Sequence, residues 1–208
     1  MTTTFVPGTV DDLPPGYPSD WEQSSVLKDG GIVRVRPIAP QDAEGLQELV
    51  RSMSTESSYF RFFRVKRELT EEELAEFTKL DYRTRMALIA VLDGRIVGVG
   101  RYNTSEEDPS LAEVAFTVAD GMQGMGIGTL LLYRLTAFAR SRGISGFRAF
   151  LLADNHAMMR VFRNAGFTLS REIDEGVYTV SFPTEESDAV LEAEGEAERR
   201  ATAASLMP

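Results

Sequence analysis

The chain has 208 residues, of which 43% are hydrophobic, and a formal net charge of −10. It contains no cysteine and one histidine, which excludes disulfides, thiolate metal sites and a cysteine acyl-enzyme and argues against metal chemistry. The acidity lies at the two ends, because residues 1–30 carry −4, residues 184–208 carry −5 and residues 31–183 only about −1. We therefore expect one globular domain without a metal and without a nucleic-acid partner.

The hydrophobic pattern argues against a membrane protein. The longest uninterrupted apolar run covers residues 86–92, which is far too short to span a bilayer. The first twelve residues have neither the basic start nor the apolar core of an export signal. We expect a cytoplasmic protein with no membrane partner, present as a monomer or a homodimer.

The chain opens with a polar segment that precedes the domain. Residues 1–24 contain four prolines and predict an extended, partly disordered arm. Trp21 lies in this arm, and it either docks on the domain or stays mobile with the arm. A hairpin over residues 25–37 follows, because β-branched residues alternate on both sides of Asp29-Gly30.

Three amphipathic helices are predicted after this hairpin. Their apolar residues recur with the helical period, and the third begins with a capping box from Thr70 to Glu73. The second mixes aromatic with basic residues, which favours a half-buried helix with a solvated arginine face over a nucleic-acid surface. The helices are expected over about residues 40–53, 54–67 and 70–80.

The remainder of the chain predicts strands that alternate with helices. Asp93-Gly94 marks a hairpin, and the two later helices each end just before a glycine. The expected strands cover residues 86–92, 95–102, 113–118, 146–152, 167–172 and 177–182. The expected helices cover residues 129–142 and 155–165, and residues 184–208 form an acidic, alanine-rich helix or a tail.

The turn after strand 113–118 carries three alternate glycines just before a helix. Helix N-termini attract anions through unpaired N–H groups, and glycines leave those groups open. A Rossmann fingerprint is excluded because Thr129 stands where its third glycine is required. A P-loop is excluded because Ile127 and Gly128, rather than lysine and serine or threonine, follow Gly126. These residues alone leave a phosphate site and a ligand-free turn equally open.

The spacing Gln123-x-x-Gly126-x-Gly128 resembles the pyrophosphate-binding loop of the GNAT superfamily of acetyl-CoA-dependent N-acetyltransferases. The resemblance covers roughly residues 25–183. It implies an α+β GNAT fold with a mixed, mostly antiparallel twisted sheet of about seven strands and four or more flanking helices. It also implies acetyl-CoA as cosubstrate, held by Gln123, Gly124, Met125, Gly126, Ile127, Gly128 and Thr129.

A second resemblance concerns the acceptor. The segments VLKDGGIVRVRPIAPQD and SSYFRFF are similar to the catalytic domain of bacterial Pat-type protein lysine acetyltransferases. This similarity implies acetylation of protein lysines, for example in acyl-CoA synthetases. Because the chain has no cysteine to carry an acyl group, we expect direct transfer in a ternary complex. Such enzymes are often fused to a regulatory module, which we do not expect here. Two alternatives stay open: acetylation of a small amine, and a non-catalytic acyl-CoA-binding module.

Direct transfer requires that an ammonium with a pKa of about 10 lose a proton. Glu113 is the candidate general base, because it opens the strand leading to the glycine loop at the position where many GNAT enzymes place one. Partial burial would favour this role, and a strand-end glutamate that faces water is the alternative. The backbone of Phe116 and Val118 resembles the family segment that pairs with pantetheine and polarises the acetyl carbonyl.

Downstream, Asn155, Phe162 and Gly166-Phe167 follow a second GNAT motif with one departure. Asn155 is either a pantetheine contact or a plain helix cap. Phe162 stands where many GNAT enzymes have a tyrosine that protonates the leaving thiolate, so no general acid is assigned. We expect His156 to be solvated and outside the site.

Overall fold

The structure is a computed structural model that describes residues 13–205. These residues contain eight strands and six α-helices. The strands are β1 (Gln23–Val26), β2 (Ile32–Pro37), β3 (Arg85–Leu92), β4 (Arg95–Thr104), β5 (Leu111–Val118), β6 (Gly146–Leu152), β7 (Ser170–Asp174) and β8 (Val177–Pro183). The helices are α1 (Ala43–Ser52), α2 (Thr55–Phe62), α3 (Glu71–Thr78), α4 (Ile127–Ser141), α5 (His156–Asn164) and α6 (Asp188–Ser205).

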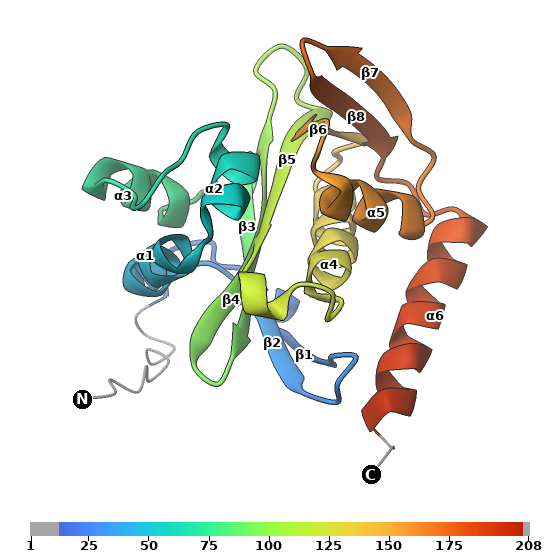
Figure 1. Ribbon diagram of the computed structural model, residues 1–208, viewed down its shortest axis with the longest axis horizontal. Coiled ribbons are helices and arrows are strands. Elements are labelled where there is room, and N and C mark those ends of the chain that lie inside the picture. Colours follow the sequence, from blue (N-terminus) through green and yellow to red (C-terminus); the bar gives the residue numbers. More distant parts are fainter. Residues whose placement is uncertain (1–12, 206–208) are drawn as a thin grey trace.

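All eight strands join one sheet in the order β1-β2-β3-β4-β5-β6-β8-β7. Neighbouring strands are antiparallel except β5 and β6, which are parallel. Helices α1, α2 and α3 cover one face, and α4 and α5 lie on the other (Figure 1). The predicted α+β fold with a mixed, mostly antiparallel sheet is confirmed, with eight strands rather than about seven because both strands of the first hairpin join it.

Several predicted boundaries were wrong, and three of them matter for the shape of the domain. The helix expected over residues 54–67 ends at Phe62, because Phe63 adopts a left-handed backbone with φ of 58°. The strand expected from residue 167 begins at Ser170, where pairing with β8 starts. The helix expected from residue 129 begins two residues earlier, directly after Gly126.

The N-terminal segment packs on the domain where the structure describes it. The Trp21 ring lies edge-on to the buried Phe138 ring of α4, with centroids 4.9 Å apart. The Tyr17 hydroxyl donates to the Pro37 carbonyl at 3.1 Å. Docking is therefore the correct alternative for Trp21, whereas the rest of the expected arm, residues 1–12, lies outside the described residues.

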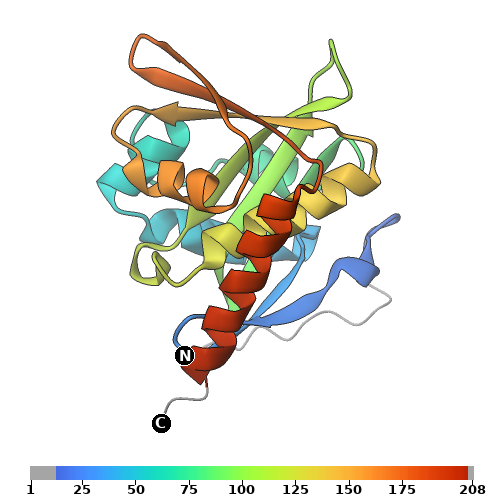
Figure 2. The ribbon, with the colours of Figure 1, turned by 90° about the vertical axis from the view of Figure 1, so that its right-hand side faces the viewer.

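Helix α6 packs against the domain beside α4 (Figure 2). Val190 is buried, and the backbone of Ala189 lies so close to Gly166 that a Cβ at Gly166 would approach the Ala189 carbonyl oxygen to 2.4 Å. Of the two forms expected for this acidic segment, helix and tail, the structure has a helix over Asp188–Ser205. Within residues 13–205, no helix combines the length and the apolar content that a membrane span requires.

Candidate active site

The parallel strands β5 and β6 separate part-way along the sheet. They pair only at Leu111, Ala112 and Glu113, whereas β6 stays paired with β8 as far as Leu152. Beyond Glu113, β5 is held by β4 alone on this stretch. The result is a wedge-shaped opening between two strands of the same sheet.

Backbone groups of β5 line this opening. The Ala119 N–H donates to the Val97 carbonyl at 2.9 Å, so Ala119 faces β4. Because backbone groups alternate in direction along a strand, the N–H and C=O groups of Phe116 and Val118 point away from β4 and into the opening. Such oriented N–H groups can pair with an amide-containing ligand or stabilise a developing oxyanion.

The loop that follows β5 presents open amides at the start of α4. Gly124 and Gly126 have φ values of 81° and 96°, a backbone region that favours glycine. Gly126 caps the helix without a side chain, and no acidic residue stands in the first turn. The positive end of the helix is therefore open to an anion through the N–H groups of Ile127, Gly128 and Thr129.

Lys28 adds a cation to this loop and was missed by the sequence analysis. It lies in the turn between β1 and β2, where its Nζ donates to the Gly124 carbonyl at 3.1 Å and its N–H donates to the Met125 carbonyl at 3.4 Å. Lys28 and Gly124 are 96 residues apart in the chain, so no local pattern could have joined them.

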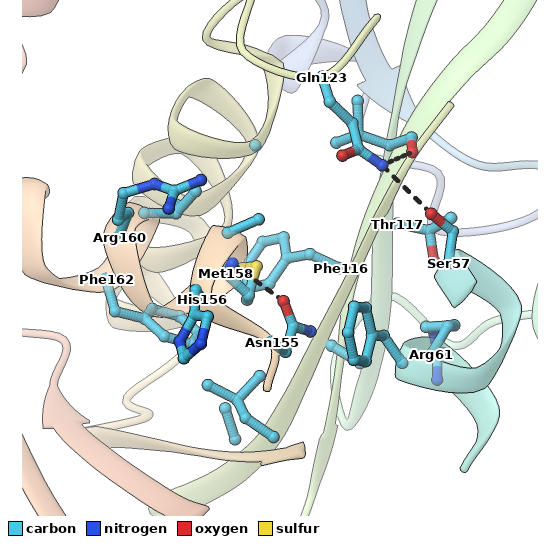
Figure 3. Close-up of a pocket in the computed structure, with 18 of the residues that line it drawn as sticks. Ser57, Arg61, Phe116, Thr117, Gln123, Asn155, His156, Met158, Arg160 and Phe162 are labelled. Atoms are coloured by element: carbon cyan, nitrogen blue, oxygen red, sulfur yellow. Dashed lines mark hydrogen bonds between the residues drawn. The ribbon is translucent and has the colours of Figure 1, made fainter. Parts of the chain in front are cut away.

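The opening and the loop form one cleft of about 740 Å³, a volume typical of small-molecule sites. Helix α2 lies on one side of β5 and α5 on the other (Figure 3). Met125 is the one candidate residue outside the lining. The candidates that line the cleft are Glu113, Phe116, Val118, Gln123, Gly124, Gly126, Ile127, Gly128, Thr129, Asn155 and Phe162. Among the described residues, no group of His, Cys, Asp and Glu side chains is placed to hold a metal ion.

The two sides of β5 face different walls of the cleft. The Phe116 ring points to α5, where its centroid lies 6.2 Å from that of Phe162, and the Val118 side chain points to the start of α4. Since side chains alternate along a strand, Glu113 and Thr117 point to the opposite face, which α2 covers. The cleft therefore joins an α4–α5 side that carries the glycine loop to an α2 side that carries Glu113.

Glu113 is exposed rather than partly buried. Glu113 lines the open cleft, so its carboxylate is in contact with solvent. Arg61, in the last turn of α2, shares this end of the cleft. Burial lowers the pKa of Arg61, and the nearby Glu113 carboxylate opposes that effect. Arg61 is thus a cleft residue, whereas the sequence analysis placed it on a solvated helix face.

The downstream candidates come from α5. Asn155 caps this helix, because its Oδ1 accepts from the Met158 N–H at 3.1 Å (Figure 3). The cap alternative is therefore correct, and a pantetheine contact by the same residue stays a prediction. His156 lies beside it in the cleft lining and is exposed, although the sequence analysis left it outside the site.

Phe162 is fully buried between the Phe116 and Phe182 rings, with centroid distances of 6.2 and 5.1 Å. No tyrosine replaces its missing hydroxyl within the described cleft lining. The Tyr133 hydroxyl donates to the Ala165 carbonyl, and burial raises its pKa to about 12. The general acid therefore stays unassigned.

Comparison with known proteins identifies the family of this chain. Residues 50–167, more than half of the chain, match the Acetyltransferase (GNAT) family. The chain belongs to this family. It is 30% identical to the acetyltransferase PA5475 of Pseudomonas aeruginosa over 164 residues, which are 77% of this chain and 87% of that protein. It is 31% identical to the acetyltransferase Pat of Mycolicibacterium smegmatis over 73% of this chain but only 45% of Pat.

Solved GNAT structures agree with this assignment. The GNAT domain of S. lividans Pat is 39% identical, with a TM-score of 0.75 over 80% of this chain and 99% of that domain. The acetyltransferase yncA of Salmonella typhimurium, solved with acetyl-CoA, shares the fold at 19% identity and a TM-score of 0.60, over 75% of this chain and 96% of yncA. The chain is thus a GNAT acetyltransferase that resembles the catalytic domain of Pat enzymes.

Proposed function

We propose that this acetyltransferase moves the acetyl group of acetyl-CoA directly to the side-chain amine of a protein lysine, with Glu113 as general base. The observation that carries the proposal is the continuity of the cleft. Open amides at the glycine loop form one end, Glu113 forms the other, and the backbone of Phe116 and Val118, which faces away from β4, joins them. The sequence resemblance to Pat-type protein lysine acetyltransferases, together with the similarity to the GNAT domain of S. lividans Pat, supports a lysine acceptor.

The residues at the loop end suit a phosphorylated ligand. The N–H groups at the start of α4 and the Lys28 ammonium group would hold the pyrophosphate of acetyl-CoA. The backbone of Phe116 and Val118 would pair with the pantetheine amides and, at the reacting end, donate to the thioester carbonyl oxygen. This arrangement points the acetyl group towards the end of β5 that carries Glu113.

At that end, Glu113 would take one proton from the acceptor ammonium, directly or through a water molecule. The amine then attacks the thioester carbon, and the β5 N–H groups stabilise the negative charge on the oxygen. The carbon–sulfur bond breaks, the nitrogen gives up its second proton to solvent, and the sulfur leaves as a thiolate. A free thiol has a pKa of about 8.5, so water can protonate this leaving group without a tyrosine at Phe162.

An acceptor panel tests the proposal. We expect mass spectrometry to find acetyl groups on a lysine peptide, with a higher kcat/KM than for a polyamine, a free amino acid or an aminoglycoside. A small amine that reacts at least about tenfold better would favour the small-amine alternative. Binding of acetyl-CoA with no transfer to any acceptor would favour the non-catalytic module, which the phenylalanine at Phe162 supports.

Lys28→Ala is expected to weaken acetyl-CoA binding about threefold to fivefold with little change in kcat, because it removes one exposed charge at the loop. Lys28→Arg should retain the affinity, and Lys79→Ala, an exposed lysine outside the cleft lining, serves as the matched control. Calorimetric titration at low and high salt measures the effect, which should shrink as salt screens the charge. Equal affinities for Lys28→Ala and Lys79→Ala at low salt would contradict this role.

A further inference from the structure

Asp120 lies in the turn between β5 and the glycine loop, outside the lining of the cleft. Its carboxylate accepts hydrogen bonds from the Ser54 N–H at 2.6 Å, from the Ser57 hydroxyl, and from Gln123 Nε2 at 3.1 Å. Gln123 Nε2 also donates to the Ser57 hydroxyl at 3.3 Å (Figure 3). One carboxylate therefore ties the first residue of the cofactor loop to the first turn of α2.

We infer that Asp120 is a positioning residue that holds α2 against the cofactor loop, so that acetyl-CoA bound at the loop orders the α2 wall of the cleft. The inference rests on the proposed acetyl-CoA site. It concerns a contact between segments that lie 66 residues apart in the chain. It assigns a role to Gln123 as well, because this side chain is held by the same carboxylate.

Helix α2 has few other contacts that could fix its position. Ser58 is its one fully buried residue, and the Ser58 hydroxyl is bound to the backbone of Lys66 just beyond the helix. Phe62 is only partly buried against the core, and Tyr59 is 47% exposed. Apolar burial therefore contributes little to the placement of α2, and polar contacts at its start contribute a larger share.

The carboxylate suits the helix end that it contacts. Ser54 is the N-cap of α2, so Asp120 places a negative charge at the positive end of the helix. Burial tends to raise the pKa of Asp120, but the hydrogen bonds from Ser57 and Ser54 outweigh it and hold the pKa below its usual value. Asp120 is therefore ionised at neutral pH. Hydrogen bonds to an ionised carboxylate are stronger than those between neutral groups.

The segment that Asp120 holds forms part of the cleft wall. Phe60, Arg61 and Phe63 all line the cleft from α2 and its C-terminal end. A shift at the start of this short helix would move these side chains together, because a helix of eight residues moves as a unit. Cofactor binding at the loop and the shape of the α2 wall are thus linked through one side chain.

Hydrogen exchange read by mass spectrometry, with and without acetyl-CoA, tests the link without a known acceptor. The matched control is Asp108→Ala, because Asp108 is also exposed and accepts from the N–H and hydroxyl of Ser110, at 3.0 and 2.7 Å, but lies outside the cleft lining. In the wild type and in Asp108→Ala, acetyl-CoA should slow exchange both at residues 123–130 and at residues 55–63. In Asp120→Ala, residues 55–63 should exchange about tenfold faster or more and gain little protection from acetyl-CoA.

Ser57→Ala keeps the Ser54 contact and should give an intermediate effect, so it carries the test if Asp120→Ala does not fold. Equal acetyl-CoA protection of residues 55–63 in the wild type and in the variant, with the loop protected in both, would overturn this inference alone. A wild-type loop that acetyl-CoA fails to protect would overturn the proposed cofactor site, and the inference with it.

Discussion

Glu113→Gln is expected to lower turnover about 100-fold or more while leaving acetyl-CoA affinity nearly unchanged. Glutamine keeps the size of the side chain but cannot take a proton from the acceptor ammonium. Glu113 also lies at the other end of the β5 opening from the loop amides, so the loop should be unaffected. Turnover is measured by thiol release, and affinity by titration with acetyl-CoA.

The matched control for this change is Glu56→Gln, because Glu56 also lines the cleft as an exposed carboxylate. Its turnover should stay within about threefold of wild type. The deficit of Glu113→Gln should shrink as the pH rises towards the pKa of the acceptor amine, because solvent then supplies the neutral amine. A Glu113→Gln enzyme as active as Glu56→Gln at neutral pH would remove Glu113 from the mechanism.

Gly126→Val is expected to weaken acetyl-CoA binding at least about tenfold. Gly126 has φ of 96°, a conformation that a β-branched residue adopts only with strain, and it caps α4 directly before the open amides. The substitution should therefore shift the loop as well as shield its N–H groups. Calorimetric titration measures the affinity, and circular dichroism checks that the variant is folded.

Gly121→Val provides the same side chain five residues earlier. No atom lies within 4 Å of a Cβ built at Gly121, and its backbone is outside the left-handed region. This variant should bind acetyl-CoA like the wild type. If folded Gly126→Val and Gly121→Val proteins bound acetyl-CoA equally tightly, the glycine loop could not be the cofactor site.

Features of the fold that depend on neighbouring residues could be predicted from the sequence. The capping box of α3 is present as expected, with the Glu73 carboxylate accepting from the Thr70 N–H and the Thr70 hydroxyl accepting from the Glu73 N–H. The Asp93-Gly94 turn joins β3 to β4, also as expected. In both cases the side chain or backbone that decides the structure lies within a few residues of the position it controls.

Features that depend on distant contacts could not be predicted. The left-handed backbone at Phe63, which ends α2, is unusual for a bulky residue and carries no local signal. Lys28 and Asp120 join the candidate site through partners 96 and 63 to 66 residues away. The exposure of Glu113 depends on the open cleft that it lines, which segments far apart in the chain enclose. The motif residues were therefore found, and their supporting partners were not.

Thiol release from acetyl-CoA, measured together with acetylation of an amine acceptor, tests the central claim most directly. The chain contains no cysteine, so every thiol detected comes from coenzyme A. Direct transfer by a Glu113-dependent acetyltransferase predicts equal amounts of free thiol and acetylated lysine peptide, with no acetyl group left on the protein. Thiol release without an acetylated acceptor, or an acetylated protein that forms before the acceptor is added and then donates to it, would contradict the account.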